Sequence, residues 1–200
     1  GLLIPMIMPV EAPLWMVALS TAFAVIIGKE IFGGTGMNIW NPALLARAFF
    51  FFSYPSMISG DKVWIAGDSR CHLTSHSTGT NGSGPTPAFC ILIGAVILLL
   101  TNVASWRTMI SVFVGGYLMA LIFQPISGVE AYQQLLMGGF AFGAVFMATD
   151  PVTSAQTNTG KYVYGLLIGA MAVIIRCINP GYPEGMMLAI LLMNTFAPLI

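Results

Sequence analysis

The chain has 200 residues, of which 57% are hydrophobic and only 7% are charged, whereas ordinary soluble domains carry about 25% charged residues. This composition excludes a soluble globular fold, because so few polar residues cannot cover the apolar surface, and it favours a membrane protein. Seven basic and seven acidic residues balance each other, so no nucleic-acid or other polyanionic partner is expected.

The apolar runs are separated by glycines, prolines and charged residues, which divide the sequence into successive predicted helices. Residues 14–32 form a full span, because about 20 apolar residues cross the hydrocarbon core of a bilayer. A shorter run at 37–54 comes next, and the segment at 55–87, rich in Gly, Ser and Thr, is expected outside the bilayer. The remaining predicted helices cover residues 88–103, 108–123, 134–149, 162–178 and 186–200.

These elements predict an all-α polytopic membrane protein whose helices form a bundle. Glycines four residues apart, Gly139 with Gly143 and Gly165 with Gly169, favour close contact between helices in lipid.

The polar segment divides the chain into a membrane region at 1–54, an extramembrane loop at 55–87 and a second membrane region at 88–200. The chain starts with Gly1 rather than Met and ends inside an apolar run, so we interpret it as a piece of a larger membrane protein.

Two stretches share one pattern: an apolar helix, a cation, a break rich in Gly or Pro, and another apolar run. They read IGKEIFGGTGMNIWNP and VIIRCINPGYPEGMM, with Lys29 and Arg176 as the cations. Matched interruptions in two parts of a membrane protein indicate a repeat of discontinuous helices around a central site. Because the two stretches share few letters, the repeat is a hypothesis about architecture.

Six ionisable residues lie within or at the edge of the predicted spans. Each costs about 2.5–3.5 kcal/mol at a helix centre, so it needs a partner, a cavity or an interface. The long side chains of Lys161 and Arg176 are expected to reach the interface as anchors, whereas Glu30 and Asp150 are too short to do so. The six residues are Lys29, Glu30, Arg47, Asp150, Arg176 and Glu184.

Glu30 and Asp150 both stand beside a predicted helix break. Glu30 precedes Gly33 and Gly34, and Asp150 precedes a proline, which lacks the N–H that a continuing helix needs. Membrane proteins build sites for Na⁺ or H⁺ from a carboxylate beside free backbone carbonyls, and Glu184 in NPGYPEG has the same character. We therefore predict an ion path along Glu30, Gly33, Gly34, Asp150 and Glu184. The residues alone support an ion-handling or small-solute membrane protein.

No resident metal site, disulfide framework or nucleotide-binding motif is predicted. The three cysteines have no CxxC spacing. His72 and His76 are four residues apart, but their neighbours are typical of a loop, in which that spacing does not define a helix face. The sequence contains no Walker motif and no GxGxxG after a strand.

Three long stretches resemble the NqrB family, a membrane component of the Na⁺-translocating NADH:quinone oxidoreductase. They are KEIFGGTGMNIWNPALLARAFFFFSYP, MGGFAFGAVFMATDPVTSAQTNTGKYVYG and INPGYPEGMMLAILLMNTFAPL. The resemblance covers nearly all of residues 14–54 and 88–200, and RnfD of the Rnf ferredoxin:NAD⁺ oxidoreductase is the nearest relative of that family. The stretch GMNIWNPAL favours the quinone-reducing family over RnfD.

The resemblance implies a multi-pass subunit of a redox-driven sodium pump in the bacterial inner membrane, with inverted halves like those of urea transporters. In this six-subunit complex, electrons would pass from NADH through other subunits to an FMN bound covalently to this one. They would then reach riboflavin and ubiquinone while Na⁺ is exported. The subunit would not be active alone, and Glu30 with its glycines would belong to the region that couples ion and quinone chemistry.

The predicted FMN loop departs from the family pattern, in which GDxVW is followed by Asp-Gly-x-Ser-Gly-Ala-Thr and the threonine carries FMN. Here Asp68 lies in the expected register and the threonine six residues later is Thr74, but Cys-His-Leu replaces Ser-Gly-Ala at 71–73. We expect FMN on Thr74, with Thr78 and Thr80 as reserve positions, and a loop without FMN is the alternative.

Two other functions are compatible with the sequence. A non-redox channel of the urea-transporter type would place Glu30 and Asp150 along a solute path, and the altered loop is the one feature that favours it. An Rnf-type subunit would share the fold but serve another electron route. Bound flavin distinguishes the pump from the channel.

Overall fold

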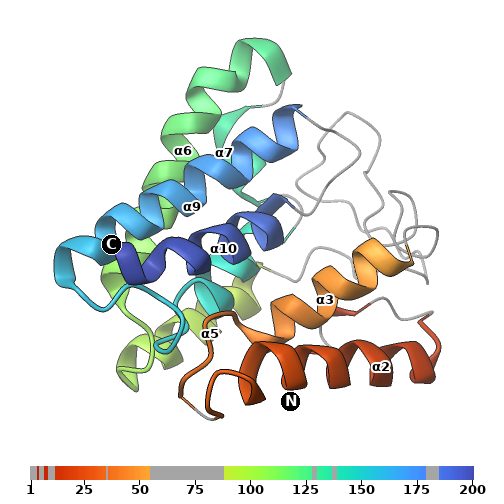
Figure 1. Cartoon of the computed structure of the whole chain (residues 1–200). Helices are drawn as coiled ribbons and strands as arrows, with labels where there is room; N and C mark the ends of the chain where they lie inside the picture. The colour runs from red at the N-terminus through yellow and green to blue at the C-terminus, as the bar shows by residue number, and fades with distance from the viewer. Residues whose placement is uncertain are drawn as a thin grey trace.

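The computed structural model describes residues 4, 7–8, 12–34, 36–54, 88–127, 130–136, 139–178 and 185–200. All regular secondary structure in these ranges is helical, which confirms the predicted all-α class. Figure 1 shows the helices as a bundle in which α9 and α10 run beside each other and α2 lies along α3.

The N-terminal part is an antiparallel pair of helices joined by a glycine-rich break. Helix α2 (Leu14–Val25) continues into a π-helical turn, η1 (Ile26–Glu30), and α3 (Pro42–Ser53) returns along it. The rings of Phe23 and Phe49 stack with centroids 4.2 Å apart, and the ring of Trp15 meets that of Tyr54 at the other end of the pair. Aromatic contacts therefore hold the pair along its length.

The C-terminal part contains two long helices, α6 and α9, and several short ones. Between them the chain forms short pieces that end in a second π-helical turn, η2. The elements are α5 (Ala88–Leu100), α6 (Trp106–Ser127), α7 (Ala131–Leu136), α8 (Phe140–Phe142), η2 (Gly143–Met147), α9 (Asn158–Ile178), α10 (Gly185–Phe196) and the 3₁₀ turn η3 (Ala197–Leu199).

Helices α6 and α9 pack in parallel at very short range, and glycines make this contact. A Cβ atom at Gly165 would lie 2.7 Å from the carbonyl oxygen of Thr108, and one at Gly169 would overlap the carbonyl oxygen of Val112. Both numbers rise together along the two helices, so the N-terminal ends of α6 and α9 lie at the same end of the molecule. The predicted packing role of Gly165 and Gly169 is confirmed.

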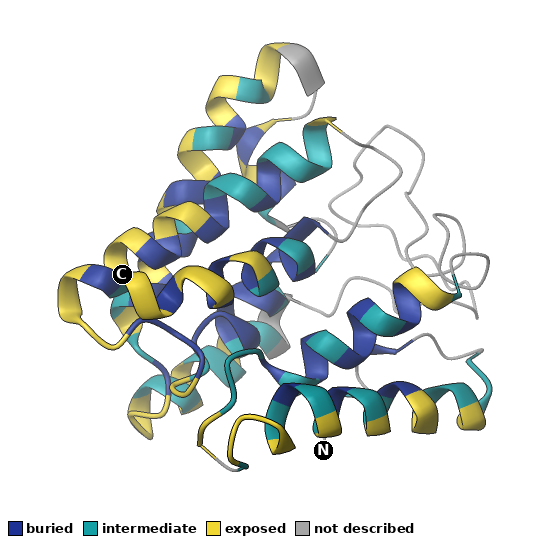
Figure 2. Ribbon diagram, viewed as in Figure 1, coloured by how far each residue is buried: buried dark blue, intermediate teal, exposed yellow. Residues whose placement is uncertain are grey.

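Among the described residues, two segments are long and apolar enough to cross a membrane, Trp106–Pro125 in α6 and the whole of α9. Figure 2 shows buried residues concentrated on α9, on α10 and on part of α3, whereas exposed residues follow the outer faces of α2 and α6. The exposed side chains include Leu14, Leu92 and Ile122. Apolar side chains on the outside of a bundle are expected where the solvent is lipid.

The predicted span at 134–149 is wrong, because the structure breaks this run into separate pieces. Helix α7 ends at Leu136, and Gly139 adopts φ 72° before α8 begins. A positive φ is favourable for glycine but not for other residues, so Gly139 shapes a turn here. The packing role that the sequence pattern suggests for Gly139 stays a prediction.

Arg176, for which the sequence predicts a role as an interfacial anchor, is bound within the protein. Its Nη1 donates a hydrogen bond of 2.7 Å to the backbone carbonyl of Gln134, in the last turn of α7. Carbonyls at a helix C-terminus lack intrahelical donors, and a cation is favoured there by the helix dipole. Arg176 therefore caps α7 at the point where the run is interrupted.

Candidate functional site

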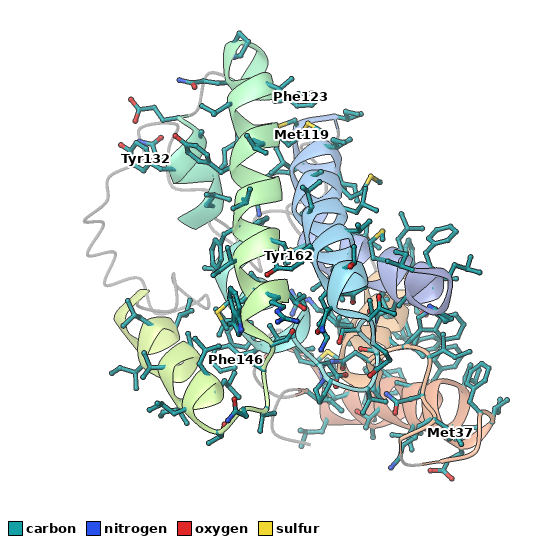
Figure 3. The ribbon with its side chains drawn as sticks, turned by 90° about the vertical axis from the view of Figure 1, so that its left-hand side faces the viewer. Met37, Met119, Phe123, Tyr132, Phe146 and Tyr162 are labelled. Carbon is teal, nitrogen blue, oxygen red and sulfur yellow. The ribbon has the colours of Figure 1, made fainter. Side chains whose placement is uncertain are left out.

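Two breaks in the helices define the candidate site. The first separates η1 from α3, at residues 31–41, and the second separates η2 from α9, at residues 148–157. A π-helical turn directly precedes each break, and π-helical turns are frequent at functional sites. Figure 3 places Met37, in the first break, at the opposite end of the molecule from Phe123 and Tyr132.

The first break begins at Glu30 and turns through glycines. Gly33 and Gly34 have φ angles of 113° and 92°, which explains why glycine stands at both positions. Their N–H groups donate to the carbonyls of Glu30 and Lys29 at 3.2 and 3.0 Å. The carboxylate of Glu30 is exposed and forms no hydrogen bond with the described part of the chain.

The first break ends on Trp40 and Asn41, which bind to other parts of the molecule. The indole N–H of Trp40 donates to Oγ1 of Thr195 in α10 at 3.0 Å. Asn41 is the N-cap of α3, since its Oδ1 accepts the N–H of Ala43 at 3.0 Å. Pro42 follows at the first helical position, where proline is favourable, so the Asn-Pro pair fixes the start of α3.

The second break is organised by the carboxylate of Asp150. Its Oδ1 accepts the backbone N–H of Val152 at 3.3 Å, and its Oδ2 accepts the hydroxyl of Thr153 at 3.1 Å. This turn follows η2, whose Phe146 packs against Gly94 of α5 (Figure 3). Thr153 is buried and Asp150 is partly buried.

The two breaks meet through a hydrogen bond between their polar side chains. Nδ2 of Asn41 donates to Oδ2 of Asp150 at 3.3 Å, although the two residues are 109 positions apart. The Asp150 carboxylate lies within electrostatic range of the Tyr164 side chain in α9. The hydroxyl of Tyr164 donates to Oδ1 of Asn194 in α10 at 2.5 Å.

We name these five residues the polar cluster: Asn41, Asp150, Thr153, Tyr164 and Asn194. Tyr164 is fully buried and Asn194 is 1% exposed, so the cluster extends into the core. Nδ2 of Asn194 has no hydrogen-bond partner among the described residues. The donors to Asp150 named above are all neutral groups. A carboxylate in such surroundings is suited to attract a small hard cation, which prefers oxygen ligands.

Of the site residues predicted from the sequence, the structure places Asp150 in the polar cluster. Glu30, Gly33 and Gly34 lie in the first break, but none of them forms a hydrogen bond with the cluster. Glu184 and the candidate FMN threonines Thr74, Thr78 and Thr80 lie outside the described residues.

Sequence reasoning missed the other members of the cluster. The Asn-Pro pair at 41–42 was a readable helix start, and a buried Tyr or Asn inside an apolar run is itself a signal. The contacts of Thr153 and Asn194 depend on the tertiary structure, so the sequence alone did not indicate them.

Comparison with known proteins gives a consistent result along the entire chain. Residues 1–200 match the family described as NQR2, RnfD, RnfE. Three relatives share one name, that of a subunit of the Na(+)-translocating NADH-quinone reductase. They come from Chromohalobacter salexigens, with 49% identity, Stutzerimonas stutzeri, with 45%, and Azotobacter vinelandii, with 44%.

Each of these matches includes all of this chain but only 56% or 57% of the relative. The chain thus spans a little over half the length of these curated relatives. The match to the first runs over 229 residues, so within this region the relative carries residues that the 200-residue chain lacks. Because the family match covers every residue and the described part of the structure is all-helical with apolar helices, the chain belongs to the NQR2, RnfD, RnfE family.

Proposed function

We propose that this chain is a membrane subunit of a sodium-translocating NADH:quinone reductase. The observation that carries the proposal is the match along the whole chain to relatives that bear this name. NADH would be oxidised on another subunit of a six-subunit complex, and ubiquinone would be the final electron acceptor. The complex would lie in the bacterial inner membrane, with this subunit crossing it several times and Na⁺ as its cargo.

FMN and riboflavin are the cofactors we propose for this subunit, and both supply electron transfer when bound. FMN would be attached through its phosphate to Thr74, with Thr78 and Thr80 as reserve positions. The family pattern has small residues before the threonine, because the hydroxyl must reach the phosphoryl donor without obstruction, whereas His72 and Leu73 stand at these positions in this chain and would crowd that approach. This assignment comes from the resemblance of the loop, in which Asp68 keeps the family register.

The residues of this chain would provide the ion path. Asp150 would attract Na⁺ at the junction of the two breaks, since its hydrogen-bond donors among the described residues are neutral. Glu30, Gly33 and Gly34 would line the approach from the exposed end of η1, and we keep Glu184 as a further proposed member of the path. Replacing Glu30 or Asp150 by Leu should then raise the sodium concentration that quinone reduction requires.

The Rnf-type route remains the second candidate, because the matching family includes RnfD. It differs in its redox partners, ferredoxin and NAD⁺, so the two routes are separated by measuring which acceptor a purified complex reduces. A channel without redox chemistry, the third function compatible with the sequence, would bind no flavin.

In-gel flavin fluorescence of the denatured subunit tests the redox proposal. The parent chain and the variants Thr74→Leu, Thr78→Leu and Thr80→Leu should be expressed with the partner subunits and a flavin transferase. We expect fluorescence in the parent and in the variants at 78 and 80, and its loss in Thr74→Leu. Loss of fluorescence in Thr78→Leu or Thr80→Leu instead would assign the FMN attachment to that threonine. Absence of fluorescence in the parent chain would contradict covalent FMN on this chain.

A further inference from the structure

We propose that Asn41 is a positioning residue for Asp150 and that Oδ1 of Asp150 is the oxygen offered to the transported cation. This inference rests on the proposed function, in which Na⁺ passes the Asp150 carboxylate. It adds Asn41 to the predicted ion path, which did not include this residue.

The orientation of the Asn41 side chain is fixed by its two hydrogen bonds. Its Oδ1 accepts the N–H of Ala43 and thereby caps α3, so its Nδ2 is the end that faces Asp150. An amide rotated by half a turn would lose both bonds, because the oxygen would face a carboxylate and the NH₂ group would face a donor. Asn41 is buried, at 6% exposure, which limits competition from solvent.

The two oxygens of Asp150 are not equivalent. Among the described residues, Oδ2 accepts two donors, Nδ2 of Asn41 at 3.3 Å and Oγ1 of Thr153 at 3.1 Å, whereas Oδ1 accepts one, the N–H of Val152. A carboxylate oxygen offers about two lone-pair sites. Within the described part of the chain, both lone-pair sites of Oδ2 are therefore filled and one site of Oδ1 is not, so the geometry points to a cation bound through Oδ1 alone.

Asn41 also links the Asp150 carboxylate to the N-terminal end of α3. Asn41 belongs to the start of α3, its neighbour Trp40 is bonded to α10, and Asp150 follows η2. A shift of α3 relative to η2 would lengthen the bond between Asn41 and Asp150. Groups that orient a ligating carboxylate in this way commonly change metal affinity about 10–100-fold when they are removed.

The test compares variants in the assembled complex, with the sodium concentration for half-maximal quinone reduction as the readout. Asn41→Ser removes the donor to Asp150 but keeps a side chain that is favourable as an N-cap. Asn38→Ser is the matched control, because the one described hydrogen bond of the Asn38 amide goes to the carbonyl of Trp40 in its own break and not to Asp150. Thr153→Val removes the other donor to Oδ2 with little change of shape, and Asp150→Leu tests the site itself.

We expect the half-saturating sodium concentration to rise about tenfold in Asn41→Ser and in Thr153→Val, and to stay at the parent value in Asn38→Ser. A purely structural role would lower the amount of complex or its rate at saturating sodium without moving the half-saturating concentration, and that result would overturn the inference. A shift in Asn38→Ser equal to that in Asn41→Ser would overturn it as well.

The two proposals fail in different ways. An unchanged sodium dependence in Asp150→Leu would overturn the role of Asp150 in the ion path, and the inference with it. A shift in Asp150→Leu without one in Asn41→Ser and Thr153→Val would overturn the inference alone.

Discussion

Tyr164 and Asn194 show how a very apolar chain keeps polar side chains in its core. Both are almost completely buried, and the hydroxyl of Tyr164 donates to Oδ1 of Asn194. A buried polar group without a partner costs about 1–3 kcal/mol, more than a typical hydrogen bond contributes. The pair therefore joins α9 to α10 and leaves one amide group, Nδ2 of Asn194, directed into the core without a described partner.

Tyr164→Phe should destabilise the subunit by about 1–3 kcal/mol, because Asn194 would lose the donor to its Oδ1 while staying buried. The measurement is the thermal unfolding midpoint of the purified complex in detergent, which we expect to fall. Tyr162→Phe is the control, because Tyr162 is 42% exposed on the same helix. An equal fall in both variants, or none in Tyr164→Phe, would contradict the assigned role of the pair.

For single residues, the sequence indicated candidates for the ion path, but it could not show which residues contact each other in the folded chain. Glu30 and Asp150 were predicted for the same reason, a short carboxylate beside a helix break, yet only Asp150 lies in the polar cluster. The difference arises from Asn41, which is distant in the chain and reaches Asp150 only through the packing of α3 near η2. No local pattern encodes that contact.

Several side-chain hydrogen bonds in this molecule fix where its helices begin and end. The Asn41 cap starts α3, the hydroxyl of Thr157 accepts the N–H of Gly160 at the start of α9, and Arg176 caps α7. The long helices were predictable, because apolar length is read directly from sequence. The interruption after α7 was not predictable in this way. In a sequence, a glycine that allows close helix packing cannot be told from one that adopts a positive φ in a turn, as Gly139 does.

Gly169→Ala should separate α6 from α9. The added Cβ would overlap the carbonyl oxygen of Val112 and the backbone nitrogen of Gly116, and neither backbone atom can move without its helix. Overpacking of this kind costs about 1–3 kcal/mol, so we expect a lower unfolding midpoint and less assembled complex. Leu167→Ala, at an exposed position of α9, should leave both unchanged. A stable Gly169→Ala complex would contradict the close packing.

Across the molecule, the polar cluster joins the parts of the chain that flank the polar loop. Asn41 comes from the region before the loop, and Asp150, Tyr164 and Asn194 come from the region after it. Trp40, next to Asn41, makes a second link through its hydrogen bond to Thr195 of α10. The division into two membrane regions was predicted from composition. Their meeting at the breaks was suggested only by the hypothesis of a repeat, which no contact in the structure tests, and which stays a prediction.

NADH-driven uptake of radioactive sodium by closed vesicles that contain the assembled complex decides whether this chain serves a sodium pump. We predict uptake that requires NADH and quinone, continues when a protonophore collapses the proton gradient, and falls at low sodium concentration in Asp150→Leu. Vesicles that reduce quinone normally but take up no sodium, or whose uptake ends when the protonophore is added, would contradict the claim that this chain is part of a primary sodium pump.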